Sequence, residues 1–129
     1  MAIRIVRLGS TRASGEGLRL GTVRRPPRGV PKGEVAARNF YDVWVPDAAP
    51  SEALLKQAQQ STDDPQRWKA FVRRYRSEMK QPPARRLLDL LAALSHTTSF
   101  SVGCYCADES RCHRSVLREL LEERGAKIE

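Results

Sequence analysis

The chain has 129 residues, which suffices for one domain with a single hydrophobic core. It contains no run of about 18 apolar residues and no signal-peptide pattern, so we expect a cytoplasmic protein without a membrane partner. The net charge is +8, and residues 1–40 hold nine Arg or Lys against Glu16 and Glu34, a balance of +7. This asymmetry favours an anionic partner, either a phosphorylated small molecule or a nucleic acid, although a solvated basic surface would explain the same count.

The first third is predicted to form two short strands and a basic loop. Residues 2–8 alternate apolar and Arg side chains and indicate a strand with one exposed face, and residues 18–23 indicate a second extended segment. Residues 9–17, rich in Gly, Ser and Thr, are expected to form the loop between them. Prolines then fix the backbone of residues 24–33 and glycines permit tight bends, which predicts an ordered loop. This proline-rich loop carries Arg24, Arg25, Arg28 and Lys32.

The middle of the chain is predicted to hold one strand and three helices. Residues 39–45 are aromatic and β-branched, a composition that favours a strand. Ser51 is the predicted N-cap of the first helix, and Asp64 followed by Pro65 is the start signal of the second. A third, strongly amphipathic helix is expected over residues 84–96.

Residues 99–121 gather all three cysteines of the chain and one of its two histidines. The pattern predicts a strand over residues 100–106, a short loop and a helix that ends at Gly125. Strand-then-helix is the usual way an α/β fold presents a ligand site, at the carboxyl end of the strand. An odd number of cysteines without an export signal favours reduced thiols over a disulfide framework. At the helix start, the dipole would favour a thiolate at Cys112 or a bound phosphate.

Three interpretations of this cluster are weaker or purely structural. A phosphatase-like thiol needs an arginine six positions after the cysteine, and Arg114 does not stand there relative to any cysteine. A zinc site could draw on Cys104, Cys106, Cys112 and His113, but it would lack a paired C-x-x-C, so no metal ligand is predicted. A structural role would bury the two strand cysteines, Cys104 and Cys106, and leave His113 as a hydrogen-bonding residue at the helix start.

The favoured interpretation is an anion site at the strand-to-helix crevice. Arg114, the amides near Cys112 and His113 would hold a phosphate or carboxylate, helped by Arg24 and Arg28 if the proline-rich loop folds over the same sheet edge. Asp42 and Trp44 are further candidates, although a core Trp beside a strand-flanking Asp explains them equally well. The predicted ligand-binding residues are therefore Arg24, Arg28, Asp42, Trp44, Cys104 and Arg114, and the predicted catalytic residues are Cys112 and His113.

Three motifs of the front half occur together in one known family. R-x-x-P-R-G spans residues 24–29, D-x-W-x-x-x-x-A-P-S spans residues 42–51, and D-P-x-R-W-x-x-F-x-x-x-Y spans residues 64–75. On these motifs the chain resembles, over nearly its whole length, the YeaO-like family of small bacterial proteins, a domain-of-unknown-function family. Its Cys104 and Cys112-His113-Arg114 resemble the other branch of the wider family. The resemblance implies a single α/β domain with a central, largely parallel sheet flanked by helices, in a Rossmann-like layered fold, and it brings no established reaction.

Two functions of different class follow from the sequence. In the first, the protein binds or transforms a phosphate-bearing ligand such as a nucleotide, with three arginines as clamps and with Cys112 and His113 as nucleophile or acid–base groups. It predicts arginines that converge on one concave site. In the second, the protein is a nucleic-acid-binding accessory module that uses its basic first third without catalysis. That function predicts a flat basic face. The sequence identifies no cofactor.

Overall fold

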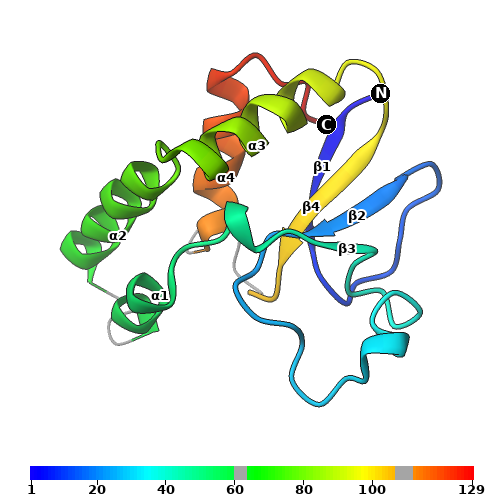
Figure 1. Cartoon of the computed structure of the whole chain (residues 1–129), viewed down its shortest axis with the longest axis horizontal. Helices are drawn as coiled ribbons and strands as arrows, with labels where there is room; N and C mark the ends of the chain where they lie inside the picture. The colour runs from blue at the N-terminus through cyan, green and yellow to red at the C-terminus, as the bar shows by residue number, and fades with distance from the viewer. Residues whose placement is uncertain (60–63, 107–111) are drawn as a thin grey trace.

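The computed structural model describes residues 1–59, 64–106 and 112–129, and its centre is a sheet of four parallel strands (Figure 1). The strand order is β1-β4-β2-β3. The strands are β1 (Ile3–Arg7), β2 (Leu18–Gly21), β3 (Val43–Trp44) and β4 (Phe100–Cys104). Every residue of β4 is buried, because this strand lies between β1 and β2 and both of its faces are covered. The chain is therefore a single α/β domain with a parallel sheet, which confirms the predicted fold class.

Four α-helices are described in the same residues. They are α1 (Glu52–Gln59), α2 (Pro65–Glu78), α3 (Pro82–Leu94) and α4 (His113–Glu123), with 3-10 turns η1 (Lys32–Glu34) and η2 (Pro46–Ala48). The start of α2 confirms its predicted signal: the Asp64 carboxylate accepts a hydrogen bond of 2.9 Å from the Gln66 amide, and Pro65 takes the first helical position. Within the described residues, no helix combines the length and the apolar character needed to cross a bilayer.

The four helices share one hydrophobic core with the sheet. In Figure 1 they lie to one side of the strands. This core joins strand residues to residues of every helix, among them Ile3, Phe100, Val102, Leu54, Tyr75, Leu88 and Leu117. Tyr75 of α2 is fully buried, and its hydroxyl donates to the Ala48 carbonyl oxygen at 2.6 Å, which ties η2 to the helical layer. The helices therefore form a layer that packs against one face of the sheet, including Phe100 and Val102 of β4.

Loops cover the other face of the sheet and are held there by a buried ion pair. The Arg19 side chain of β2 is fully buried, and its Nε lies 2.8 Å from a Glu16 carboxylate oxygen. The same carboxylate accepts a hydrogen bond from the Ser101 hydroxyl of β4. Arg19 also donates to the carbonyl oxygens of Ser10 and Asn39, both at 2.8 Å. Although Arg19 belongs to the basic first third, its side chain therefore stabilises the fold.

The strand predicted over residues 39–45 is shorter in the structure, where only Val43–Trp44 pairs with β2. Asn39 has a φ of 65°, in the left-handed region that interrupts an extended chain. The Tyr41 ring then packs on Gly21, so closely that an added Cβ on this glycine would lie 2.3 Å from the ring. This tertiary contact holds the aromatic segment as a turn. β2 itself ends at Gly21, two residues earlier than predicted.

Candidate functional site

The three cysteines lie together where β4 ends and α4 begins. Cys104 is the last residue of β4, Cys106 follows two residues later, and Cys112 is the N-cap of α4. Their Sγ atoms all lie within 4.8 Å of one another. All three are free thiols, and Cys104 and Cys112 are buried while Cys106 is exposed. The strand-to-helix connection thus builds a cluster of three thiols with one member open to solvent.

His113 and Arg114 fix the first turn of α4 against this cluster. The buried His113 has its Nε2 2.7 Å from the Thr22 carbonyl oxygen; because a carbonyl only accepts, Nε2 donates and Nδ1 keeps a lone pair, 3.8 Å from Cys112 Sγ. Burial lowers the pKa of His113 and favours the neutral ring. Arg114 is 4% exposed and donates to the Cys106 carbonyl oxygen at 2.7 Å. Its Nε has no hydrogen-bond partner in the described part of the chain.

The thiols of the cluster differ in acidity. Hydrogen bonds from Cys104 and Cys112 lower the pKa of Cys106, and the charge of the nearby Arg114 lowers it further. The pKa of Cys104 is raised, chiefly because its thiol is hydrogen-bonded to Cys106. For Cys112, the hydrogen bond with Cys104 lowers the pKa, but the bond with Cys106 and burial outweigh it and leave the pKa raised. The exposed Cys106, rather than Cys112 at the helix start, is the most acidic thiol.

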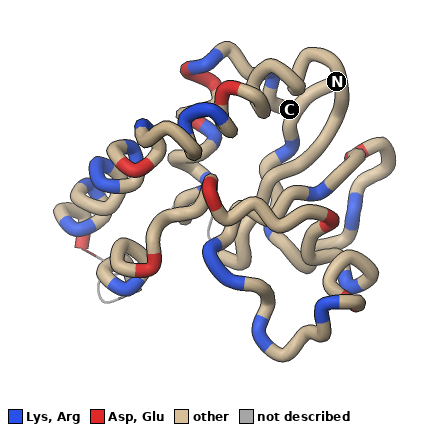
Figure 2. The backbone as a smooth tube through the Cα atoms, viewed as in Figure 1, with Lys and Arg blue, Asp and Glu red and all other residues tan. Residues whose placement is uncertain are grey.

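A basic cavity of about 430 Å³ opens beside the cysteines. Its walls come from the proline-rich loop, α1, the end of β4 and the start of α4. Figure 2 shows the Lys and Arg positions of the proline-rich loop along one edge of the fold. Four cationic side chains and one carboxylate line the cavity: Arg24, Arg25, Arg28, Lys56 and Glu52. Residues 24–56 thus bring an excess of positive charge to the thiol cluster.

The four cations of the basic cavity are not equally engaged. Arg24 donates to two backbone carbonyl oxygens at 3.1 Å, neutral partners that fix its position, and its charge helps to lower the pKa of Glu52. Arg25 pairs with Glu52 at 2.9 Å on the open rim, where such a pair is weak. Arg28 and Lys56 form no hydrogen bond or ion pair with the described residues. Neither side chain is therefore held by a direct polar contact with the described residues, although the charge of Lys56 helps to lower the pKa of Glu52.

Three of the predicted ligand-binding residues, Asp42, Trp44 and Arg114, are not among those that line the basic cavity. Asp42 accepts hydrogen bonds from the Arg12 guanidinium at 2.7 and 3.0 Å, and this pairing is the main cause of its lowered pKa. Trp44 stands on the edge strand β3, and its Nε1 donates to the Val23 carbonyl oxygen at 2.8 Å. Both side chains hold β3 and its neighbouring loops in place.

The rest of the predicted set does come together. The members that line the basic cavity are Arg24, Arg28, Cys104 and His113. Cys112 and Arg114 are buried next to it. The lining residues that the sequence did not predict include Arg25, Lys56 and Cys106. The signal for Cys106 was present, since it shares a strand face with Cys104 at a spacing of two, whereas Lys56 reaches the site only through the packing of α1.

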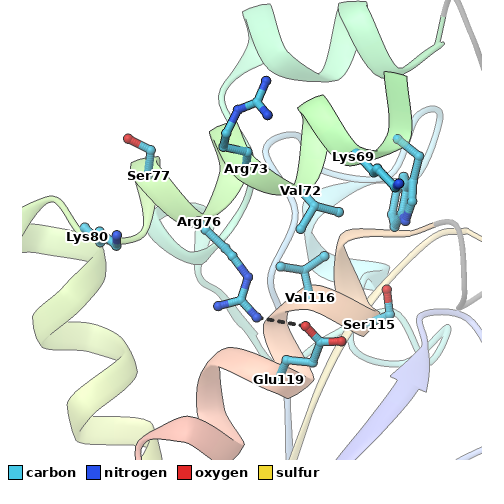
Figure 3. A pocket seen from close by; sticks show the side chains of 10 residues that line it. Lys69, Val72, Arg73, Arg76, Ser77, Lys80, Ser115, Val116 and Glu119 are labelled. Atoms are coloured by element: carbon cyan, nitrogen blue, oxygen red, sulfur yellow. Dashed lines mark hydrogen bonds and ion pairs between the residues drawn. The ribbon is translucent and has the colours of Figure 1, made fainter. Parts of the chain in front are cut away.

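A larger cavity of about 740 Å³ lies between α2 and α4 (Figure 3). Lys69 and Arg73 contribute positive charge there, but Arg76 is held in ion pairs with Glu119 at 2.8 Å and Glu123 at 2.9 Å. No cysteine or histidine is among the described residues that line it. This cavity therefore offers charge without a thiol or an imidazole group among its described lining residues.

Comparison with known proteins places the chain in a family. Neither a search of curated proteins nor a search of solved structures gave a match. The family model DUF488-N3a, described as the active DUF488-N3 subclade, matches residues 3–125, a span that includes the sheet, the helices and the thiol cluster. The chain belongs to the DUF488-N3a family.

Proposed function

We propose that the protein binds a small phosphate-bearing or otherwise anionic ligand, such as a nucleotide, in the basic cavity. The observation that carries this proposal is the convergence of four cations and one carboxylate on a concave space of about 430 Å³ beside the thiols. That volume is within the range of small-molecule sites, about 300–1,000 Å³. In a partly enclosed cavity a guanidinium or ammonium group binds an oxyanion more strongly than on open surface.

The residues at the basic cavity would have two roles: the cations would bind the anion, and the thiols and His113 would act on the bound ligand. Arg28 and Lys56 would contact the anion directly, and Arg24 would add fixed positive charge. Chemistry on the bound ligand would fall to Cys112 and His113, with the more acidic and exposed Cys106 as the thiol nearest to solvent. The family description as an active subclade is consistent with such a role. Our assignment of Cys104 and Cys112-His113-Arg114 to a branch distinct from the YeaO-like proteins belongs to this proposal.

The alternative function, a nucleic-acid-binding accessory module, has less support. It requires a spread of available cations on the first forty residues. Several arginines there are instead engaged within the fold: Arg4 pairs with Glu129, Arg12 with Asp42 and Arg19 with Glu16. Of the other cations of this segment, Arg24, Arg25 and Arg28 line the basic cavity, a concave site that suits a compact ligand better than a polymer.

Substitution of Arg28 by glutamine is expected to weaken the binding of inorganic phosphate and of adenosine nucleotides by at least about tenfold, because a hydrogen bond to a charged group contributes about 1.5–3 kcal/mol. Isothermal titration of the purified, reduced protein measures this affinity. Arg38→Gln is the matched control, since it removes the same charge from an exposed position outside the cavity. We expect it to change the affinity by less than about twofold.

The same titration separates the two functions. Equal loss of affinity in both variants, or no saturable binding of phosphate and nucleotides to the wild type, would contradict an anion site in the basic cavity. Binding of a single-stranded oligonucleotide that falls steeply with salt, without binding of mononucleotides, would establish the accessory-module alternative instead.

A further inference from the structure

The geometry points to a metal site: Cys104, Cys106 and Cys112 bind one zinc-class cation through their three thiolates. The proposal does not depend on anion binding by the cations of the basic cavity, but it replaces the thiol chemistry proposed above, because Cys106 and Cys112 would be ligands of the cation rather than free nucleophiles. Its basis is their mutual distance, with every Sγ within 4.8 Å of the other two. Thiolates at about 2.3 Å from a tetrahedral zinc ion lie about 3.8 Å apart, so shifts of about 1 Å close the cluster on the ion.

The fold brings together three cysteines that the sequence does not space as a typical zinc motif. A zinc site is usually recognised by a paired C-x-x-C, whereas here the ligands are Cys104, Cys106 two positions later and Cys112 six positions after that. The end of β4 provides the first two, and the N-cap of α4 brings the third to them. The Cys112 side chain makes no capping hydrogen bond to the helix, so its sulfur is not committed to that role.

The surroundings hold the ligands in place. The Arg114 guanidinium donates to the Cys106 carbonyl oxygen at 2.7 Å, which fixes the backbone of the one exposed ligand. Hydrogen bonds of this kind around the ligands are what makes a metal site geometrically selective. His113 is fixed in turn by its 2.7 Å contact with Thr22. These two contacts therefore fix the start of α4 and the backbone of Cys106 on either side of the cluster.

The charge around the cluster suits a three-thiolate centre. Three thiolates and one divalent cation carry a net charge of −1, which is costly in a buried position unless cations stand nearby. Arg114 is almost fully buried beside the cluster and has an Nε without a partner in the described residues. Arg24 and Arg28 of the basic cavity lie on the adjoining side. Three protein ligands leave the fourth position of a tetrahedral ion to a non-protein ligand, as in catalytic zinc sites.

Metal analysis of the full chain tests this proposal. The protein is expressed without an affinity tag in zinc-supplemented medium, purified under reducing conditions without chelator, and assayed by inductively coupled plasma mass spectrometry. We expect about one zinc per chain. After the zinc is removed, cobalt(II) should produce the near-ultraviolet sulfur-to-cobalt charge-transfer absorption of a thiolate site. Neither signal depends on ligand binding or on catalysis.

Two variants show whether the metal sits on the cysteines. Cys106→Ser changes the exposed ligand, and we expect it to lower cobalt affinity at least about tenfold and to reduce the charge-transfer band, with the fold retained by circular dichroism. His96→Asn is the control, because His96 lies near the opposite end of β4, where it contacts the Gly125 carbonyl oxygen. Its metal binding should equal the wild type. A folded, reduced wild type that binds neither zinc nor cobalt, or a Cys106→Ser protein that binds both like the wild type, would overturn the proposal.

Discussion

Replacement of Glu16 by glutamine is expected to lower the free energy of unfolding by about 3–5 kcal/mol, the loss typical when one partner of a buried ion pair is removed. Arg19 is fully buried and would keep its charge without a counter-ion. The variant would also lose the charge-assisted hydrogen bonds of the carboxylate to Arg19 and Ser101. Urea denaturation followed by circular dichroism measures the loss.

Glu34→Gln is the matched control for this change. Glu34 lies in η1, exposed, and its side chain forms no ion pair or hydrogen bond with the described residues. Its removal is expected to change the unfolding free energy by no more than about 0.5 kcal/mol. Equal losses in the two variants would show that the Glu16–Arg19 pair contributes no more than any surface charge.

The same ion pair makes the fold sensitive to acid. The hydrogen bond from Arg19 is the main cause that lowers the pKa of Glu16 from 4.5 to about 2. A folded pKa below the unfolded one means that the stabilisation is present above about pH 4.5 and is lost as the pH falls from there to about 2. The shift corresponds to about 3 kcal/mol, at 1.36 kcal/mol per unit. Urea midpoints measured across that window should fall more steeply in the wild type than in Glu16→Gln.

The second large effect is expected at Gly17, where the loop that precedes β2 passes over the start of β4. Gly17 has a φ of +78°, and a Cβ added there would lie 2.0 Å from the Ser99 carbonyl oxygen. Gly17→Ala should therefore cost about 2–4 kcal/mol of unfolding free energy, from strain at positive φ and from the forced movement of backbone. Thermal and urea denaturation both report this loss.

Substitution of a nearby glycine separates the strain of positive φ from the effect of the close backbone contact. Gly15 has a similar φ of +75°, but an added Cβ would meet nothing within 4 Å. Gly15→Ala is therefore expected to show only the strain of positive φ, about 1 kcal/mol. If the two alanine variants lose the same stability, the close approach of Gly17 to Ser99 does not contribute.

Local signals explain why much of the fold could be predicted. The start of α2 is set by Asp64 and Pro65, whose capping geometry depends on neighbours in sequence. The apolar run of β4 identifies a strand buried on both faces wherever the rest of the chain lies. The sequence predicts a strand that begins at residue 39, whereas β3 begins at Val43. The difference arises because the turn at Asn39 and the packing of the Tyr41 ring on Gly21 depend on tertiary contacts.

The candidate site was predictable to the extent that its residues are neighbours in sequence. The proline-rich loop identified Arg24 and Arg28, and the end of β4 identified the cysteines. The closeness of Cys106 to Cys112 could not be predicted, because it depends on how α4 returns to the end of β4. Likewise, the packing of α1 brings Lys56 to the cavity, although no motif includes it.

Anomalous diffraction would show whether one anion binds in the basic cavity. Crystals of the reduced protein would be soaked in tungstate, a heavy oxyanion with the shape of phosphate, and then in tungstate with excess phosphate. We expect an anomalous peak within hydrogen-bonding distance of Arg28 and Lys56 that phosphate displaces. Tungstate confined to the cavity between α2 and α4, or no ordered tungstate at all, would contradict an anion site in the basic cavity.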